Sequence, residues 1–217
     1  MPTPRQVIAL GLYADLMGEV KIRLACIETA TRGLSGIPGA VTREFCFLQI
    51  RMLCELIALS CLTAHGDIKE ATRLRDEYSA GKIIGQLEKL HPLFYPWPVH
   101  VKSAPPQSGV QHEMEGIKDG FLTKDELLRL YGKCGDILHR GTMKKLLSDR
   151  MPVQTNFPDI LQTVARIKTF LNEHGIMLLD EKTIMLCVLN DASNNNNVQV
   201  AIAEAVEHQP NLGFKPT

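Results

Sequence analysis

The sequence predicts a mainly α-helical bundle that carries a small β hairpin or meander at its C-terminal end. In most of the first 175 residues, apolar side chains recur every three or four positions, as they do on the buried side of a helix. After Gly175 the pattern changes to short runs rich in Ile, Val and Leu, which are typical of strands. We therefore expect a helical domain over residues 1–175 and a small β element over residues 176–217.

Start and stop signals place the helices along the chain. Asp67 with Glu70, and Thr123 with Glu126, have the spacing of a capping box, in which side chains bond the free N–H groups of a helix start. A glycine such as Gly66 commonly ends a helix. From these signals and the apolar spacing we expect helices over residues 4–31, 42–65, 67–90, 123–139, 143–149 and 159–173.

Residues 91–122 differ from the helical segments, because they contain five prolines and the only tryptophan, Trp97. A long proline-rich connection inside a domain is usually a functional loop, a lid or a disordered segment. The aromatic residues Phe94 and Tyr95 favour packing against the body of the protein over disorder. Short strands would fit at residues 99–102 and 111–115.

Three apolar runs follow residue 175: IMLLD, TIMLCVLN and VQVAIAEAV. The asparagine run at 194–197 separates the last two and suits a turn. The runs favour strands, although the end of the last one fits a helix equally well. We expect this β element to pack on the bundle through its branched residues, which are Ile184, Leu186, Val188, Val200 and Ile202.

Charge and cysteine usage bound the function classes. The chain has 24 basic and 24 acidic residues, so no overall charge draws it to nucleic acid or to an anionic membrane, although a local basic patch is compatible with this balance. Its six cysteines contain no CxxC motif and sit among apolar neighbours, as buried thiols do in a reducing compartment. Asp15 and Glu19 interrupt the apolar run that a signal peptide needs. We expect a cytoplasmic protein.

One segment, residues 45–64, is apolar enough to be compared with a membrane span. It carries Arg51 and Glu55 near its middle, and each charge at a bilayer centre costs about 2.5–3.5 kcal/mol. We therefore expect the central helix of a soluble bundle and no membrane partner. The charged stripe of Glu44, Arg51 and Glu55 has two interpretations: an internal Arg51–Glu55 ion pair, or one side of a substrate cleft.

The helix predicted over residues 123–139 has two different faces. One face is apolar and includes Tyr131 and Cys134. The opposite face is mostly small and polar, and its residues are Asp125, Leu128, Arg129, Gly132, Gly135, Asp136 and His139. Because glycine lets a second backbone approach closely, we expect a soluble homodimer that pairs this face with its copy. His139 is either a solvated residue at the helix C-terminus or part of a functional site.

A long apolar helix with embedded charges, followed by a helix that ends in Asp136-x-x-His139, resembles the HEPN superfamily of small helical proteins over residues 42–148. The motif of that family is an arginine, four to six residues, and a histidine. Here Lys133 stands in the place of the arginine, and Arg140, next to His139, would supply the guanidinium charge that a lysine lacks.

The resemblance implies an RNA-binding or RNA-cleaving protein of a defence or toxin–antitoxin system, with RNA and a protein antidote as partners. Many members of this superfamily are homodimeric ribonucleases that need no metal, so the resemblance implies a homodimer without a cofactor. Their histidine transfers protons while a nearby cation stabilises the charge on phosphorus. The residues implied for catalysis are His139, Lys133, Asp136 and Arg140. The residues implied for substrate binding are Arg51, Glu55, Glu44, Lys144 and Lys145.

Two functions of other classes fit the same sequence. The helical face around His139 would serve equally well in a non-catalytic dimerisation or protein-interaction module. The aromatic loop Phe94–Trp97 would suit a small-molecule sensor in which it covers a pocket. Cys61 and His65 have the i, i+4 spacing of two metal ligands, but two ligands do not make a site, and we expect no metal.

Overall fold

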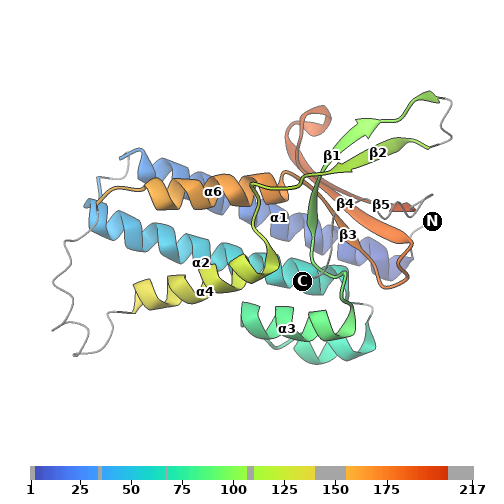
Figure 1. Ribbon diagram of the computed structural model, residues 1–217, viewed down its shortest axis with the longest axis horizontal. Coiled ribbons are helices and arrows are strands. Elements are labelled where there is room, and N and C mark those ends of the chain that lie inside the picture. Colours follow the sequence, from blue (N-terminus) through green and yellow to red (C-terminus); the bar gives the residue numbers. More distant parts are fainter. Residues whose placement is uncertain (1–2, 34–35, 67, 107–109, 140–154, 205–217) are drawn as a thin grey trace.

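The computed structural model describes residues 3–33, 36–66, 68–106, 110–139 and 155–204 (Figure 1). In chain order the elements are α1 (Pro4–Thr31), α2 (Gly39–Ala64), the 3-10 helix η1 (Lys69–Leu74), α3 (Ala80–Leu90), β1 (Trp97–Ser103), β2 (His112–Gly116), α4 (Lys124–Leu138), α6 (Pro158–Leu171), β3 (Glu173–Met177), β4 (Thr183–Asp191), the 3-10 helix η3 (Ala192–Asn194) and β5 (Asn197–Glu204).

Five strands in the described part of the chain form one antiparallel sheet, in the order β2-β1-β3-β4-β5. The fold is therefore mixed α/β, and the prediction of a helical bundle with a small C-terminal hairpin is wrong. The strand predicted at residues 99–102 lies within β1, and the strand predicted at 111–115 corresponds to β2, which begins one residue later at His112. The error arose because β1 pairs with β3, far later in the sequence, and no local pattern reveals such a pairing.

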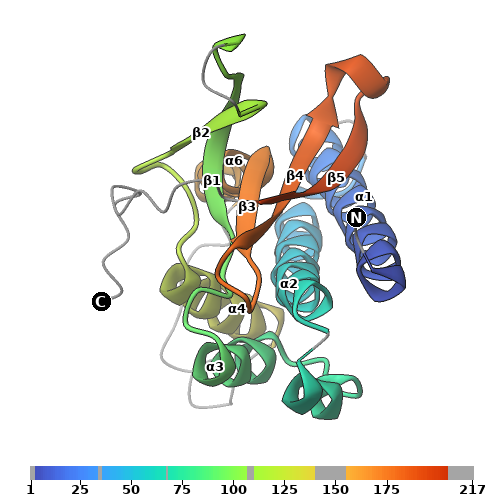
Figure 2. The same cartoon turned by 90° about the vertical axis from the view of Figure 1, so that its right-hand side faces the viewer.

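One face of the sheet packs against α1 and α6, the helices that contact its strands; in Figure 2, α6 lies behind β1 and β3, and α1 lies beside β5. Side chains of β3 and β4 that point to this face, such as Ile176 and Met185, are buried with the helices in one core. The central helix is α2, which contacts α1, α3, α4 and α6. It therefore links the layer that covers the sheet to the two helices that lie further out.

Among the described helices, α2 alone is long and apolar enough to cross a membrane by length and composition. Within the fold, however, 56% of its most apolar 18-residue window is buried. Three of its four charged side chains are paired inside the protein, Arg43 with Asp159 at 2.8 Å and Arg51 with Glu55 at 3.4 Å, and the fourth, Glu44, is exposed. These are the features of a core helix of a soluble protein, in which buried charges are matched.

The helix predicted over residues 67–90 is interrupted in the structure, where η1 and α3 are separate elements. Between them the carboxylate of Glu77 accepts hydrogen bonds from the backbone N–H groups of Tyr78 (3.1 Å) and Ser79 (2.9 Å). The Glu77 side chain thus accepts from two N–H groups that would bond to backbone carbonyl oxygens in a continuous helix, and the helix is interrupted here. Asp67 and the short helix predicted at 143–149 lie outside the described residues.

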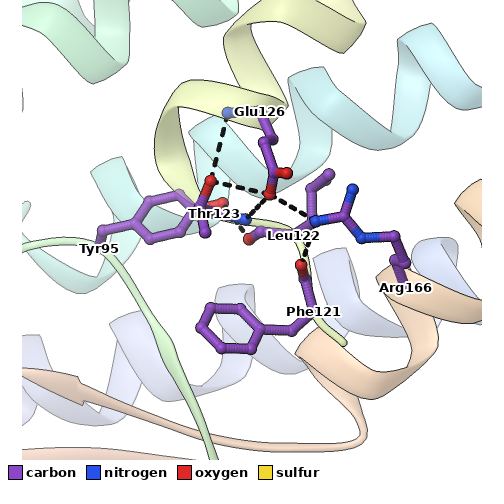
Figure 3. A network of polar contacts seen from close by, with 6 residues as sticks. All are labelled: Tyr95, Phe121, Leu122, Thr123, Glu126 and Arg166. Atoms are coloured by element: carbon purple, nitrogen blue, oxygen red, sulfur yellow. Dashed lines mark hydrogen bonds and ion pairs between the residues drawn. The ribbon is translucent and has the colours of Figure 1, made fainter. Parts of the chain in front are cut away.

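A polar network fixes the start of α4, as Figure 3 shows. The predicted capping box is confirmed, because Thr123 and Glu126 each accept the backbone N–H of the other with their side chains. Arg166 of α6 donates to the carboxylate of Glu126 and to the carbonyl oxygen of Phe121. The hydroxyl of Tyr95 donates to the backbone of the same turn at 3.2 Å. The network holds α4 against α6 and against the segment that leads into β1.

The two β hairpins of the sheet are joined where β1 meets β3, over the pairs Trp97–Gly175 and Pro98–His174. A β-carbon on Gly175 would lie 2.9 Å from the Trp97 ring, so the indole packs directly on the glycine backbone. On the opposite face of the sheet, the hydroxyl of Tyr13 in α1 lies 2.6 Å from Nε2 of His174. The two residues of β3 in this pairing therefore fix the strand to β1 and to the helical layer.

We expect the Gly175→Ala substitution to lower the free energy of unfolding by about 1–3 kcal/mol, because the new methyl group would clash with the Trp97 ring. Chemical denaturation checks this. Gly18→Ala in α1 is the matched control, since no atom lies within 4 Å of the added β-carbon. That control should raise the free energy of unfolding by about 0.5–1 kcal/mol. Equal effects of the two substitutions would rule out the Trp97–Gly175 contact.

Candidate functional site

The residues that the sequence predicts to be functional lie mainly on α2 and α4, two helices that run antiparallel side by side (Figure 1). Later residues of α4 contact earlier residues of α2. Tyr131 reaches Glu55, Gly135 lies against Arg51, and Lys133 lies over the ring of Phe47. This register places the C-terminal end of α4, and with it His139, beyond Arg51 toward the N-terminal half of α2.

Arg51, Glu55 and Tyr131 form one bonded cluster between the two helices. Nε of Arg51 lies 3.4 Å from the Glu55 carboxylate, and its Nη2 donates to the Tyr131 hydroxyl at 2.8 Å. That hydroxyl donates in turn to Glu55 at 3.2 Å, and the guanidinium lies 4.3 Å from the centre of the Tyr131 ring. Of the two interpretations of the charged stripe, the internal Arg51–Glu55 pair is the one that the structure contains.

Partial burial, followed by the negative charge of Glu55, raises the pKa of the Tyr131 hydroxyl. The hydroxyl therefore keeps its proton at neutral pH and can donate it to Glu55 while it accepts from Arg51. Tyr131 is the residue that sequence reasoning missed, because the helical wheel placed it on the apolar face. Its position four residues before Gly135 was the available signal, since both then face the same neighbour.

Gly135 has a definite structural role in this cluster. A β-carbon on Gly135 would lie 3.2 Å from Nη1 of Arg51, so the absence of a side chain lets the guanidinium lie against the surface of α4. Nη1 makes no hydrogen bond to another described residue, and the Arg51 side chain is 30% exposed. Nη1 is therefore not committed to another described residue, and the side chain is partly open to solvent. Around Gly132, by contrast, no atom lies within 4 Å of an added β-carbon.

His139 lies at the end of α4 and is exposed. Its backbone N–H donates to the carbonyl oxygen of Gly135 at 3.0 Å, which sets the residue one turn, or about 6 Å, further along the helix axis. Its imidazole makes no hydrogen bond or ion pair with another described residue. The backbone of His139 thus lies one turn beyond Gly135, the residue against which Arg51 packs. Asp136 is also exposed.

The remaining predicted site residues are more scattered. Lys133 is exposed, with its Nζ 5.7 Å from the centre of the Phe47 ring. Glu44 is exposed on α2, two turns before Arg51, and forms no ion pair with another described residue. The three other predicted basic residues, Arg140, Lys144 and Lys145, lie outside the part of the chain that the structure describes.

The aromatic loop and the Cys61–His65 pair have structural surroundings. Phe94 and Tyr95 are buried, and Tyr95 stacks on Phe170 with ring centres 5.2 Å apart. Nδ1 of buried His65 lies 2.8 Å from the backbone carbonyl oxygen of Cys61, so the pair meets through the main chain. Within the described residues there is no group of three or more His, Cys, Asp or Glu side chains that could hold a metal ion.

A second buried histidine, His174, has its proton positions fixed by its neighbours. Nδ1 lies 3.0 Å from the carbonyl oxygen of Leu171, which only accepts, so Nδ1 carries the hydrogen. Nε2 then accepts from the hydroxyl of Tyr13. Complete burial lowers the pKa of His174 to about 4, because the imidazolium would lose its hydration. The residue is thus a neutral link between β3 and α1.

The lowered pKa of His174 predicts a loss of stability in acid. Because the folded pKa of about 4 lies below the ordinary value of 6.5, the unfolded chain takes up the proton first as pH falls. The contribution of neutral His174 to the free energy of unfolding is fully present above about pH 6.5. It is lost as the pH falls toward 4, by about 3 kcal/mol at most. Denaturation at several pH values should show a shallower loss for His174→Gln than for the wild type.

The control for this pH experiment is His112→Gln in β2, where the histidine is exposed. Its pH profile should follow that of the wild type. If His174→Gln loses as much stability between pH 7 and pH 4 as the wild type does, the buried neutral imidazole is not the source of the effect.

Comparison with known proteins found no matching family model, no matching curated protein and no matching solved structure. Among the described residues of α2 and α4, the fold brings together Arg51, Glu55, Tyr131 and Gly135, and His139 follows Gly135 by one helical turn.

Proposed function

We propose that this protein binds RNA and cleaves it without a metal, at the strip of surface between Arg51 and His139. One observation carries the proposal: the guanidinium of Arg51 lies against Gly135, which precedes the exposed residue His139 by one helical turn. The HEPN-like motif has Lys133 where an arginine is expected, and Arg51 would provide the missing guanidinium from the neighbouring helix. Its planar fork suits a phosphate better than a lysine does.

The chemistry requires a base and a cation close to one phosphate. The imidazole of His139 takes the proton from a ribose 2′-hydroxyl, and the oxygen attacks the adjacent phosphorus. The bond from phosphorus to the 5′-oxygen breaks, which leaves a 2′,3′-cyclic phosphate and a 5′-hydroxyl. Nη1 of Arg51 donates to the phosphorane oxygens while negative charge develops there, and Lys133 binds the chain of phosphates.

The leaving 5′-oxygen needs a proton, and a second copy of the chain would supply it. The space around Gly132 would allow two α4 helices to approach, so that a second His139 faces the same phosphate. We therefore propose a homodimer, with a defence or toxin–antitoxin role and a protein antidote as its partner. All six cysteines are free thiols, which supports a location in the reducing cytoplasm.

We expect the purified protein to cut mixed RNA in the presence of a chelator, and His139→Ala to reduce the cleavage rate at least about 100-fold. Because His139 is exposed, the same substitution should change the free energy of unfolding by no more than about 0.5 kcal/mol. Lys133→Ala should weaken both RNA binding and turnover. Gel analysis of the fragments, with end groups identified by mass spectrometry, measures these effects.

His112→Ala is the matched control, since it removes an exposed histidine from β2, outside the α2–α4 strip, and should cut RNA at the wild-type rate. Arg51→Lys keeps the positive charge without the fork, so its cleavage rate should fall although RNA is still bound. RNA that stays intact with the wild type, or equal cleavage by His139→Ala, would remove the nuclease proposal.

A further inference from the structure

The sheet opens into a cleft beyond the point where β1 and β3 pair. β3 begins at Glu173, whereas β4 extends to Asp191 and β1 continues to Ser103. Figure 2 shows the result, two hairpins that splay apart on either side of β3. A cleft of about 720 Å³ lies here, bordered by α1, α6, β1 and β4. This volume is in the range of pockets that bind small organic molecules.

The floor of the cleft is apolar. Leu24 of α1, Val99 of β1 and Leu189 of β4 line it, and each of these side chains is almost completely buried. Ile117, next to β2, adds a half-buried apolar group at one side. Ala25 of α1 is exposed at the edge, and its small side chain leaves the entrance wide. The floor would bind the apolar body of a ligand.

The rim carries a positive charge on each of two walls. Lys21 projects from α1, where its Nζ donates to the backbone carbonyl oxygen of Asn196. Lys168 projects from α6 and forms an ion pair with Glu28 of α1. An ammonium group has three N–H donors, so both lysines keep donors for a ligand. Their two helices border the cleft from different sides.

The other polar groups of the rim also favour a ligand that accepts hydrogen bonds. The side chains of His100, Asn172 and Asn190 line the cleft and form no hydrogen bond with another described residue, so each can offer an N–H donor, and an acceptor atom, to a ligand. The two acids of the rim are already engaged, Glu28 by Lys168 and Glu173 by the backbone N–H of Val101 at 2.8 Å. Lys21 is bonded only to a backbone carbonyl oxygen and forms no ion pair with a described carboxylate, so it is the rim cation whose charge is left for a ligand.

We propose that this cleft is a binding site for a small organic acid, an apolar or aromatic molecule that carries a carboxylate or a phosphate group. Its body lies on the floor formed by Leu24, Val99 and Leu189. Its acid group lies between Lys21 and Lys168, and it displaces Glu28 as the partner of Lys168. Neither the RNA site nor the residues of α4 take part, so the site is independent of the proposed cleavage.

Ligand-observed NMR titrations with three probes of one shape test this proposal. They are naphthalene-2-carboxylate, 2-naphthyl phosphate and the neutral naphthalene-2-carboxamide. The two acids should bind at least about fivefold more tightly than the amide, because charged acceptors form stronger hydrogen bonds with lysine. Whichever acid binds more tightly identifies the natural ligand class as carboxylic acids or as phosphate esters.

Variants separate binding in the cleft from adsorption to surface charge. Lys21→Met and Lys168→Met should each weaken the binding of the acids about three- to tenfold, whereas Lys182→Met, an exposed lysine in the β3–β4 turn, should have no effect. Ala25→Trp keeps both lysines but places a large indole across the entrance of the cleft, and should abolish binding of all three probes. Thermal unfolding confirms that each variant is folded.

Several results would overturn the proposal: an amide that binds as well as the acids, no binding of any probe at millimolar concentration, or acid binding that survives Ala25→Trp. The RNA-cleavage assay keeps the two proposals apart, because Ala25→Trp should leave His139-dependent cleavage unchanged. A protein without ribonuclease activity can still bind the acids, and a protein that cleaves RNA can fail to bind them.

Discussion

Two residue pairs between β1 and β3 join the five strands into one sheet: Trp97 opposite Gly175, and Pro98 opposite His174. Without them the β1–β2 hairpin and the β3–β4–β5 strands would be separate elements. Gly175 receives the indole of Trp97 on one face, and His174 bonds Tyr13 of the helical layer on the other. Because the pairing is short, β1 and β4 diverge beyond it and leave the cleft above the start of β3. The short β1–β3 pairing thus makes the sheet continuous and also leaves the cleft between β1 and β4.

A second close approach shapes the surface between α2 and α4. Arg51 could be sequestered entirely by Glu55 and Tyr131, but it bonds them through Nε and Nη2 and directs Nη1 toward Gly135. Glycine at this position keeps the guanidinium beside the helix, one turn from His139. Carboxylate and hydroxyl partners offset the desolvation of the charge, while one donor edge stays available. A structural ion pair can in this way also present a cation to a ligand.

Much of the helical layer could be predicted from the sequence, because helices are specified by nearby residues. The bounds of α1 agree with the apolar spacing, and the capping box at Thr123 and Glu126 marks the start of α4. The internal pairing of Arg51 with Glu55 also followed from the sequence, since an i, i+4 ion pair is local. Each of these predictions depended on residues within a turn or two of one another.

The sheet and part of the site could not be predicted, because they depend on contacts between distant residues. Gly175 has the properties of a helix stop, and nothing nearby indicates that it receives the Trp97 ring. Tyr131 has a mainly apolar ring, and a helical wheel places it on the apolar face of α4. The wheel does not show that the Tyr131 hydroxyl reaches Arg51 on another helix. The cleft arises from the divergence of two hairpins, so none of its lining residues forms a motif in the sequence.

The β1–β3 pairing is tested most directly by nuclear Overhauser effects in the isotope-labelled protein. The indole protons of Trp97 should show strong effects to the α-protons of Gly175 and to the methyl groups of Ile184, which lies beside that glycine. The Tyr13 ring should show effects to the His174 ring on the opposite face of the sheet. Effects within the β3–β4 hairpin without any between Trp97 and Gly175 would contradict a continuous sheet, and with it the cleft.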